Sequence, residues 1–327
     1  MRTLLTLLLA LLITVAGCRR RPRSAGASDA TELIVRVLDV GQGDAILITN
    51  GGSTVLIDGG PSPARLGALL DSLGLGRGTI DVVILTHPHL DHLSGLRELF
   101  RSRRALTVRY VFENGDAHPT ATLRELRDSI DARVARRATI RRDTDDPCGD
   151  GRPVCTFTLR GGAKLHVMRP DPRGADANAR SAAVKLVGPD SASFTMWLAG
   201  DAEHRTLAWF DSVDYDHRPG MDVTMLKGGH HGSCDGIDER HLALTTPEAV
   251  IFSLAARNEY GHVHRQTTRL LRRLGIPWYR TDQNGTITIR STGAPGSRPS
   301  IVPSRGEASM MGPSDRSSNQ QACRGVG

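Results

Sequence analysis

Four side chains that can bind metal ions lie within one six-residue stretch, at His87, His89, Asp91 and His92. Two imidazoles two positions apart on an extended turn can converge on one cation, and the carboxylate and the third imidazole then point toward a second. Zinc binds nitrogen and oxygen ligands of these types at about 2.0–2.2 Å. Two cations about 3.5–4 Å apart can share a bridging hydroxide. The segment therefore predicts a centre for two divalent metal ions, zinc or manganese.

The histidine segment directly follows Ile80–Leu85, a run that is apolar except at Asp81 and is typical of a strand buried on both faces. Other short runs rich in β-branched residues occur early and late in the chain, and segments with helical leucine spacing, such as Arg65–Leu73, separate them. Both faces of the resulting sheets need cover. The pattern predicts an α/β layered sandwich.

The chain has 327 residues, a formal net charge of +7 and 39% apolar residues. Its glycines and prolines show no collagen-like period, which excludes a fibrous protein. No apolar run after residue 17 approaches the ~18 residues that a membrane span needs, which excludes a transporter or channel. We expect one domain over residues 32–291 and a disordered tail over 292–327, where apolar residues are few.

Residues 1–17 have the features of a secretory signal peptide: a charged start, an apolar run over Leu4–Ala16 and small residues before Cys18. Cys18 in this context resembles a bacterial lipobox, which implies cleavage before Cys18 and lipidation of its sulfur. The acyl chains would anchor the protein to a membrane. We expect an exported lipoprotein that faces the periplasm or the cell exterior, with residues 18–31 as a linker. The alternative is a soluble secreted protein.

Cys148 and Cys155 are expected to form a disulfide that staples a surface loop. They lie seven positions apart beside the turn-rich segment 146–151, and disulfides persist outside the cytosol. The alternative is two free thiols. The sequence assigns no partner to Cys234 or Cys323, because connectivity cannot be read from cysteine positions alone.

Several segments together carry a resemblance to a known family. They are Leu38–Ala45, Leu56–Gly60, Thr86–His92, Asn178–Ser181, Leu198–Asp201, Lys227–Ser233, Asn258–His262 and Arg280–Gly285. The histidine segment resembles the metal-binding motif of the metallo-β-lactamase superfamily, and the others, in this order, resemble the hydrolase domain of ComEC-type competence proteins. The resemblance implies a metallo-β-lactamase-like four-layer αββα sandwich with the metal site at one edge.

The resemblance also implies the metal ligands. They are His87 and His89 for the first metal, Asp91 and His92 for the second, and Asp201 as the bridging carboxylate. A late histidine would supply the last ligand of the second metal. His262 and His264 compete for this role, and we favour His262.

His230 and His231 are adjacent, so their side chains cannot easily point the same way. One would complete the ligands of the first metal and the other would donate a proton to the leaving oxygen. We favour His231 as the donor and count Asp91 as catalytic too. The remaining candidates would orient ligands or contact substrate: Asp58, Asn178, Lys227 and Ser233. Asp58 would orient the histidine loop, and Lys227 would either bind a substrate phosphate or only extend from a strand end.

The expected activity is that of an exported metal-dependent hydrolase, a phosphodiesterase or nuclease-like enzyme that uses a metal-bridged hydroxide. Arginine enrichment fits an anionic substrate such as DNA or another phosphodiester. The Gly-His-x-x-Gly turn usual in the superfamily is missing between His92 and Asp201, so the third ligand of the first metal stays unassigned. The alternatives are a lactone or β-lactam hydrolase and a non-catalytic, lipid-anchored DNA-binding receptor. The sequence leaves the oligomeric state open.

Overall fold

The computed structural model describes residues 31–101, 104–114, 118–143, 146–212 and 221–307. Cys18, the expected signal peptide and nearly all of the expected linker lie outside these ranges, as does the end of the expected tail. Within the described ranges, no helix combines the length and the apolar character that a membrane crossing requires.

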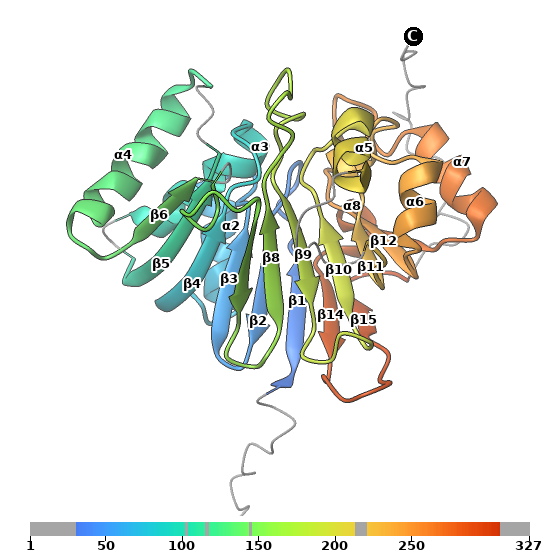
Figure 1. Ribbon diagram of the computed structural model, residues 1–327, viewed down its shortest axis with the longest axis horizontal. Coiled ribbons are helices and arrows are strands. Elements are labelled where there is room, and N and C mark those ends of the chain that lie inside the picture. Colours follow the sequence, from blue (N-terminus) through green and yellow to red (C-terminus); the bar gives the residue numbers. More distant parts are fainter. Residues whose placement is uncertain (1–30, 102–103, 115–117, 144–145, 213–220, 308–327) are drawn as a thin grey trace, which may run out of the picture.

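Two mixed β-sheets form the centre of the molecule (Figure 1). Among the described residues, the strands of the first sheet are β1 Leu33–Val37, β2 Ile46–Asn50, β3 Ser53–Ile57, β4 Gly78–Ile84, β5 Leu106–Glu113, β6 Ile140–Asp143, β14 Ile287–Ser291 and β15 Ser300–Pro303. They lie in the order β15-β14-β1-β2-β3-β4-β5-β6. The strands of the second sheet are β7 Val154–Thr158, β8 Lys164–Met168, β9 Ala183–Val187, β10 Thr195–Leu198, β11 Met225–Lys227, β12 Ala249–Phe252 and β13 Trp278–Arg280. They lie in the order β13-β12-β11-β10-β9-β8-β7.

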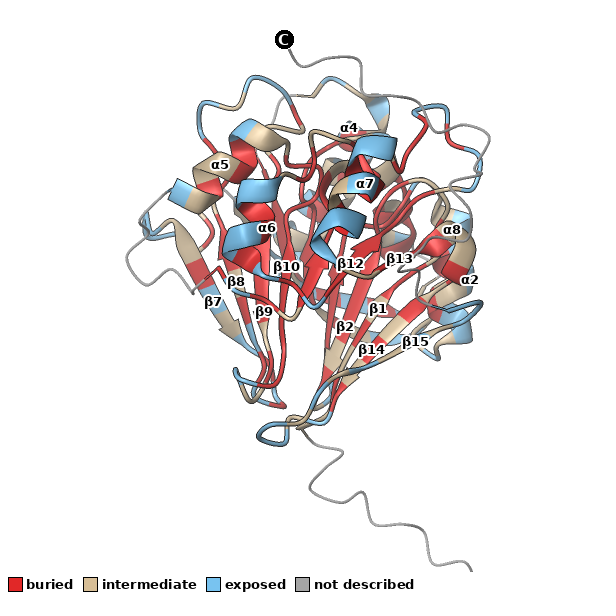
Figure 2. Cartoon of the chain, turned by 90° about the vertical axis from the view of Figure 1, so that its right-hand side faces the viewer, coloured by how far each residue is buried: buried red, intermediate tan, exposed pale blue. Residues whose placement is uncertain are grey.

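Helices cover the outer face of each sheet, and the inner faces pack against each other. The helices are α2 Pro63–Ser72, α3 Leu90–Leu93, η1 Ser94–Phe100, α4 Ala121–Ala135, α5 His204–Ser212, η2 Gly229–Gly232, α6 Glu239–Thr245, α7 Arg265–Leu274 and α8 Thr281–Asn284. Apolar side chains of α2, η1 and α4 pack on the first sheet, and those of α5, α6 and α7 pack on the second. Figure 2 shows buried strands between helices whose outer faces are exposed. The predicted αββα sandwich is confirmed.

Local sequence explains individual elements of these layers. All five residues of β3 are buried, because the other sheet covers one face and helices cover the other. The helix α2 begins at Pro63, and the hydroxyl of the preceding Ser62 accepts the backbone N–H of Arg65 at 3.3 Å. Serine is favoured directly before a helix because its side chain accepts a free backbone N–H. Proline is favoured at the first helical position. Leu66 and Leu70, four positions apart, form its buried face.

Parallel strands bring the site residues to one edge of the sandwich. The strands β3, β4 and β5 are parallel neighbours in the first sheet, and β10 to β13 are parallel neighbours in the second. Loops at the carboxyl ends of parallel strands are the usual place for a binding site. The loops that follow β4, β10 and β11 contain the histidine segment, Asp201 and His231, which explains how distant parts of the sequence meet.

The structure extends the domain beyond residue 291, which corrects the expected start of the disordered tail. The strand β15 pairs antiparallel with β14, with Ile301 opposite Ile289, and Ile301 packs against the core between the sheets. Arg305 then bonds Asp39 at 3.1 Å. The segment was missed because Ile301 and Val302 are its only large apolar residues, too few for a composition argument to detect.

Cys148 and Cys155 form a disulfide, which is the pairing expected from the sequence. It closes the loop that leads into β7, the edge strand of the second sheet. Cys234, to which we assigned no partner, is disulfide-bonded as well.

Candidate metal centre

The histidine segment forms the turn after β4 and the start of α3. His87 and His92 are fully buried. Nε2 of His87 lies 3.2 Å from Nδ1 of His89, so these two rings converge on one point. The turn before β2 packs directly on this segment, because a Cβ at Gly43 would lie only 1.9 Å from the carbonyl oxygen of Asp91. The close approach holds the segment in place and requires glycine at position 43.

Asp201 follows β10, and the imidazoles of three other residues converge on its Oδ2 atom. The distances are 3.2 Å to Nε2 of His231, 3.3 Å to Nε2 of His92 and 3.7 Å to Nε2 of His87. One carboxylate oxygen therefore faces both the His87 and the His92 sides of the site. Oδ1 is buried and has no hydrogen-bond partner among the described residues, so further lone pairs are available for a cation.

His231 lies in η2, after β11, with a φ of 53°, which is uncommon for a residue other than glycine. Its Nδ1–H donates to the carbonyl oxygen of Ser253 at 2.8 Å. Nε2 is then free to bind a cation, and it lies 3.3 Å from Oδ2 of Asp91 and 3.3 Å from Nε2 of His92. The structure thus places His231 among the ligand candidates and not in the proton-donor role that we favoured.

The separations among Asp91, His92, Asp201 and His231 fit a bound divalent cation. Bonds of about 2.0–2.1 Å at tetrahedral angles place neighbouring ligand atoms roughly 3.3–3.4 Å apart. The contacts in this group measure 3.2–3.3 Å, and most hydrogen bonds to oxygen are shorter, at about 2.7–3.0 Å. His87 and His89 provide a second pair of nitrogen ligands beside the same carboxylate. The chain's donor set therefore fits two divalent cations.

Asp58 lies directly behind these ligands, where it can orient them. Its Oδ2 is 2.8 Å from Nδ1 of His92, and it accepts hydrogen bonds from the backbone N–H and the hydroxyl of Thr86 at 2.8 and 2.7 Å. An acceptor at Nδ1 fixes the tautomer that leaves Nε2 free for a metal. Asp58 thus couples the end of β3 to the histidine segment.

A buried ion pair supports His231 in a similar way. Nζ of Lys227 is 2.8 Å from Oδ2 of Asp44, and Oδ1 of Asp44 is 3.5 Å from Nδ1 of His231. Both side chains of the pair are buried, so Lys227 cannot contact a substrate phosphate, which corrects that expectation. Asp44 was not among our candidates. The sequence feature that could have indicated Asp44 is its position directly after the Gly-Gln-Gly turn.

Charge is balanced inside the cluster by protonated imidazoles. Burial lowers the pKa of His87 well below its usual value, so this ring is neutral. Burial acts in the same direction on His92 and His231, but nearby carboxylates, Asp201 foremost, raise the pKa of both rings well above the usual value. Against its own burial, Asp201 has a pKa held well below its usual value by His231 and His92. A cation bound here would replace these protons.

His262 does not join the ligand group, which corrects the role we assigned to it. Its ring centroid lies 6.3 Å from that of His231 and 5.4 Å from that of His230. Burial, together with His231 and His230, lowers the pKa of His262 to about 3, so the ring is neutral. The competing candidate His264 accepts the backbone N–H of Cys234 at 3.1 Å. The position expected for a late histidine ligand is taken by His231.

Of the remaining candidates, His230 and Asn178 lie in the wall of the site, and Ser233 does not. His230 lies beside Glu203 and Asp235, and its Nε2 is 3.4 Å from Nδ2 of Asn178. Ser233 is buried and its hydroxyl is 3.5 Å from Nδ1 of His264, so it supports the loop and does not line the cavity.

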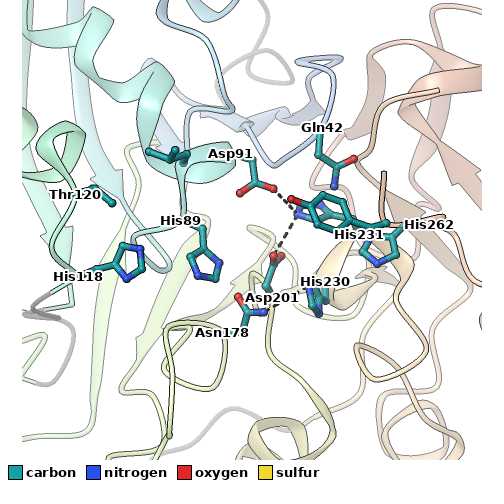
Figure 3. Close-up of a pocket in the computed structure, with 12 residues that line it drawn as sticks. Gln42, His89, Asp91, His118, Thr120, Asn178, Asp201, His230, His231 and His262 are labelled. Atoms are coloured by element: carbon teal, nitrogen blue, oxygen red, sulfur yellow. Dashed lines mark hydrogen bonds and ion pairs between the residues drawn. The ribbon is translucent and has the colours of Figure 1, made fainter. Parts of the chain in front are cut away.

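A cavity of 430 Å³ opens in front of the ligand group (Figure 3). It is lined by Gln42, His89, Leu90, Asp91, His118, Thr120, Asn178, Asp201, His230, His231, Tyr260 and His262. Our sequence candidates did not include Gln42, Thr120, Tyr260 or His118. Gln42 and Tyr260 lie within segments that carry the family resemblance but were assigned no role, and Thr120 and His118 lie on a loop that lacks a motif. The ring of His118 is 5.5 Å from that of His89. Imidazole and amide groups thus form much of the wall.

Residues 38–172 match the family model of the metallo-beta-lactamase superfamily. Together with the two-sheet sandwich and the ligand group at its edge, this match shows that the chain carries a domain of that superfamily, whose members are generally metal-dependent hydrolases.

Among curated proteins, ComE operon protein 3 of Bacillus subtilis is 26% identical over 278 residues, which are 78% of this chain and 33% of that protein. This supports a ComEC-type relation, and the chain spans about a third of the length of that relative. Among solved structures, the metallo-beta-lactamase fold protein YhfI of Bacillus subtilis has a TM-score of 0.51 and 14% identity, and the match covers 80% of this chain and 100% of that chain. This likeness concerns the fold.

Proposed function

We propose that the protein is an exported, lipid-anchored phosphodiesterase that depends on two divalent metal ions. The observation that carries the proposal is the convergence of His92, His231 and His87 on one oxygen of Asp201, at separations that fit bound cations. When bound, two such ions supply hydroxide near neutral pH and neutralise negative charge that develops on the reacting group.

The chain's own residues hold and orient the reacting groups. The carbonyl of Ser253 keeps the ring of His231 turned toward the cations, and Asp58 does the same for His92. His230 lines the cavity and its Nδ1 faces Asp235. Burial lowers the pKa of this ring, but the hydrogen bond to Asp235 and nearby carboxylates raise it above its usual value, so the protonated ring can donate its Nε2 proton to the leaving oxygen. Proton transfer by a positioned imidazole of this kind contributes typically 10²–10⁴-fold to a rate.

A phosphodiester substrate is supported by the chemistry of the cavity wall and by the ComEC-type relation. The imidazoles of His89, His118 and His230 and the amides of Gln42 and Asn178 line the cavity. These groups can donate hydrogen bonds to the oxygens of an anion. The chain also lacks the Gly-His-x-x-Gly turn between His92 and Asp201, which separates it from the pattern of the usual β-lactam hydrolases.

The test of substrate class compares two chromogenic substrates on the purified, zinc- or manganese-loaded protein. We expect turnover of bis-p-nitrophenyl phosphate and none of nitrocefin. Asp201→Asn should abolish that turnover, and His166→Gln, a change on the strand β8, should not. Turnover of nitrocefin alone would replace the phosphodiesterase proposal with a lactamase.

The lipid anchor is proposed from Cys18 and its neighbours, which lie outside the described residues. The disulfide between Cys148 and Cys155 supports an oxidising compartment. Labelling of cells with a palmitate analogue should mark the wild type and not Cys18→Ala, and only the wild type should sediment with membranes. An unlabelled wild-type protein in the soluble fraction would contradict the anchor without affecting the proposed chemistry.

A further inference from the structure

A second group of ligand-type side chains lies beside the metal centre and is not used by it. Nδ1 of His230 is 3.3 Å from Oδ1 of Asp235 and 3.4 Å from Oε1 of Glu203. One ligand atom of each of the three residues lies within 4.8 Å of the other two. The three side chains are 24–33% exposed, so an ion can reach them from solvent.

The distances in this group match those around a bound cation better than those of hydrogen bonds. A hydrogen bond from an imidazole to a carboxylate has a usual length of about 2.7–2.9 Å. A cation with bonds of about 2.0–2.1 Å at tetrahedral angles separates its ligands by roughly 3.3–3.4 Å. The two contacts of His230 have the second length, and one imidazole nitrogen faces two carboxylates at once.

The backbone holds the three side chains in this arrangement. A Cβ at Gly236 would lie 2.2 Å from the carbonyl oxygen of Gly229, so the segments that carry His230 and Asp235 are in direct contact. Nδ2 of Asn178 donates to Oε1 of Glu203 at 3.1 Å. Oδ1 of Asn178 is buried and has no hydrogen-bond partner within the described part of the chain, which leaves one more oxygen close to this group.

We propose that Glu203, His230 and Asp235 bind a further divalent cation, separate from the ions of the main centre. One nitrogen and two carboxylate oxygens suit zinc, with water in a remaining position. His230, which also lines the cavity, would then connect the bound ion with the main site. With Nδ1 bound to the cation, the ring keeps its proton on Nε2, which lies 3.4 Å from Nδ2 of Asn178, another residue of the cavity wall.

The experiment measures zinc stoichiometry by competition with a chromophoric chelator on the full-length, metal-free protein. We expect Glu203→Gln and Asp235→Asn each to lower the stoichiometry by one equivalent relative to the wild type. Glu259→Gln, which removes a carboxylate outside the group, should leave it unchanged. Identical stoichiometry in the wild type and both variants would overturn the proposal. Circular dichroism shows that each variant is folded before its zinc is counted.

A further variant distinguishes failure of this inference from failure of the proposed function. In the variant His87→Asn/His92→Asn/Asp201→Asn both ions of the main centre lose ligands, and we expect one zinc equivalent to remain. Adding Asp235→Asn should remove it. Retained binding in the quadruple variant, or no binding in the triple variant, would contradict the further site. Failure of phosphodiesterase activity alone would leave it standing, because zinc is counted without any substrate.

Discussion

Nζ of Lys227 lies 2.8 Å from Oδ2 of Asp44, and the two side chains are 0% and 1% exposed. The positive charge of Lys227 opposes the effect of burial and holds the pKa of Asp44 below its usual value. The pair connects the end of β11 to the turn before β2, and so joins one sheet to the other behind the metal centre.

Removing one partner should leave a buried charge without compensation. We expect Lys227→Met to lower the free energy of unfolding by about 3–5 kcal/mol, the usual effect of breaking a buried pair. Urea unfolding followed by circular dichroism measures this. Lys164→Met, at an exposed position of β8, is the control and should change stability by less than about 0.5 kcal/mol. A similarly small effect of Lys227→Met would show that the pair is not needed.

Asp58→Asn should weaken metal binding while the ligands themselves stay in place. Loss of such a partner behind a histidine ligand typically costs 10–100-fold in metal affinity, and the substituted amide can no longer offer two carboxylate oxygens to His92 and Thr86. Zinc affinity by chelator competition tests this prediction. Asp190→Asn, on the turn between β9 and β10, is the matched control. Equal affinities for the wild type and Asp58→Asn would contradict the orienting role.

His231 and His262 should respond differently to replacement by alanine. His231→Ala removes a nitrogen that lies 3.2 Å from Asp201, so we expect loss of about one metal equivalent and of activity. His262→Ala should retain the metal content of the wild type, because its ring lies outside the ligand group. Metal analysis of both dialysed proteins decides between them. The reverse pattern would restore His262 as the ligand.

The disulfide between Cys148 and Cys155 closes a short loop with a sequence separation of 7. Chain-entropy arguments give a loop of this size a stabilisation of about 2–3 kcal/mol. The double variant Cys148→Ser/Cys155→Ser should therefore unfold at lower urea concentration with the same dependence on urea. This variant is preferable to a reducing agent, because Cys234 is also disulfide-bonded. An unchanged midpoint would contradict the prediction.

His166, on the strand β8, makes a pH-dependent contribution to folding stability that does not involve the metal ligands. Burial, with Lys164 and Lys185, lowers the pKa of this ring below its usual value of about 6.5. The unfolded chain therefore binds the proton more readily, and the contribution of His166 to stability is present above pH 6.5 and falls as the pH drops below it. Unfolding of the wild type and of His166→Gln at pH 7.5 and 5.5 should show a smaller loss for the variant. An equal loss would contradict the assignment.

The sequence was informative where ligands are close together and follow an apolar strand. His87, His89, Asp91 and His92 fall within one turn and one short helix, so their spacing alone brings them near a common point. The αββα architecture was likewise expected from the family resemblance, and the strand pattern agreed with it.

The roles of the other site residues depended on backbone conformations and on burial, which the spacing of residues in the sequence does not reveal. His230 and His231 both adopt left-handed conformations, with φ of 44° and 53°, and this sends the two rings to different sides. Without that information, the adjacent pair could not be divided between ligand and donor, and His262 was chosen instead. Asp44 was missed because its function depends on burial against Lys227, which is distant in the sequence.

The ligands on the first sheet precede Asn114, whereas Asp201 and His231 belong to the second half of the chain. Cleavage of the connecting segment at 170–177 would therefore place them on two separate polypeptides. Each piece alone would keep only part of the donor set. Reassociation of two such fragments should therefore depend on added zinc. The ion would bind donors from both fragments and so link two polypeptides that are no longer covalently joined.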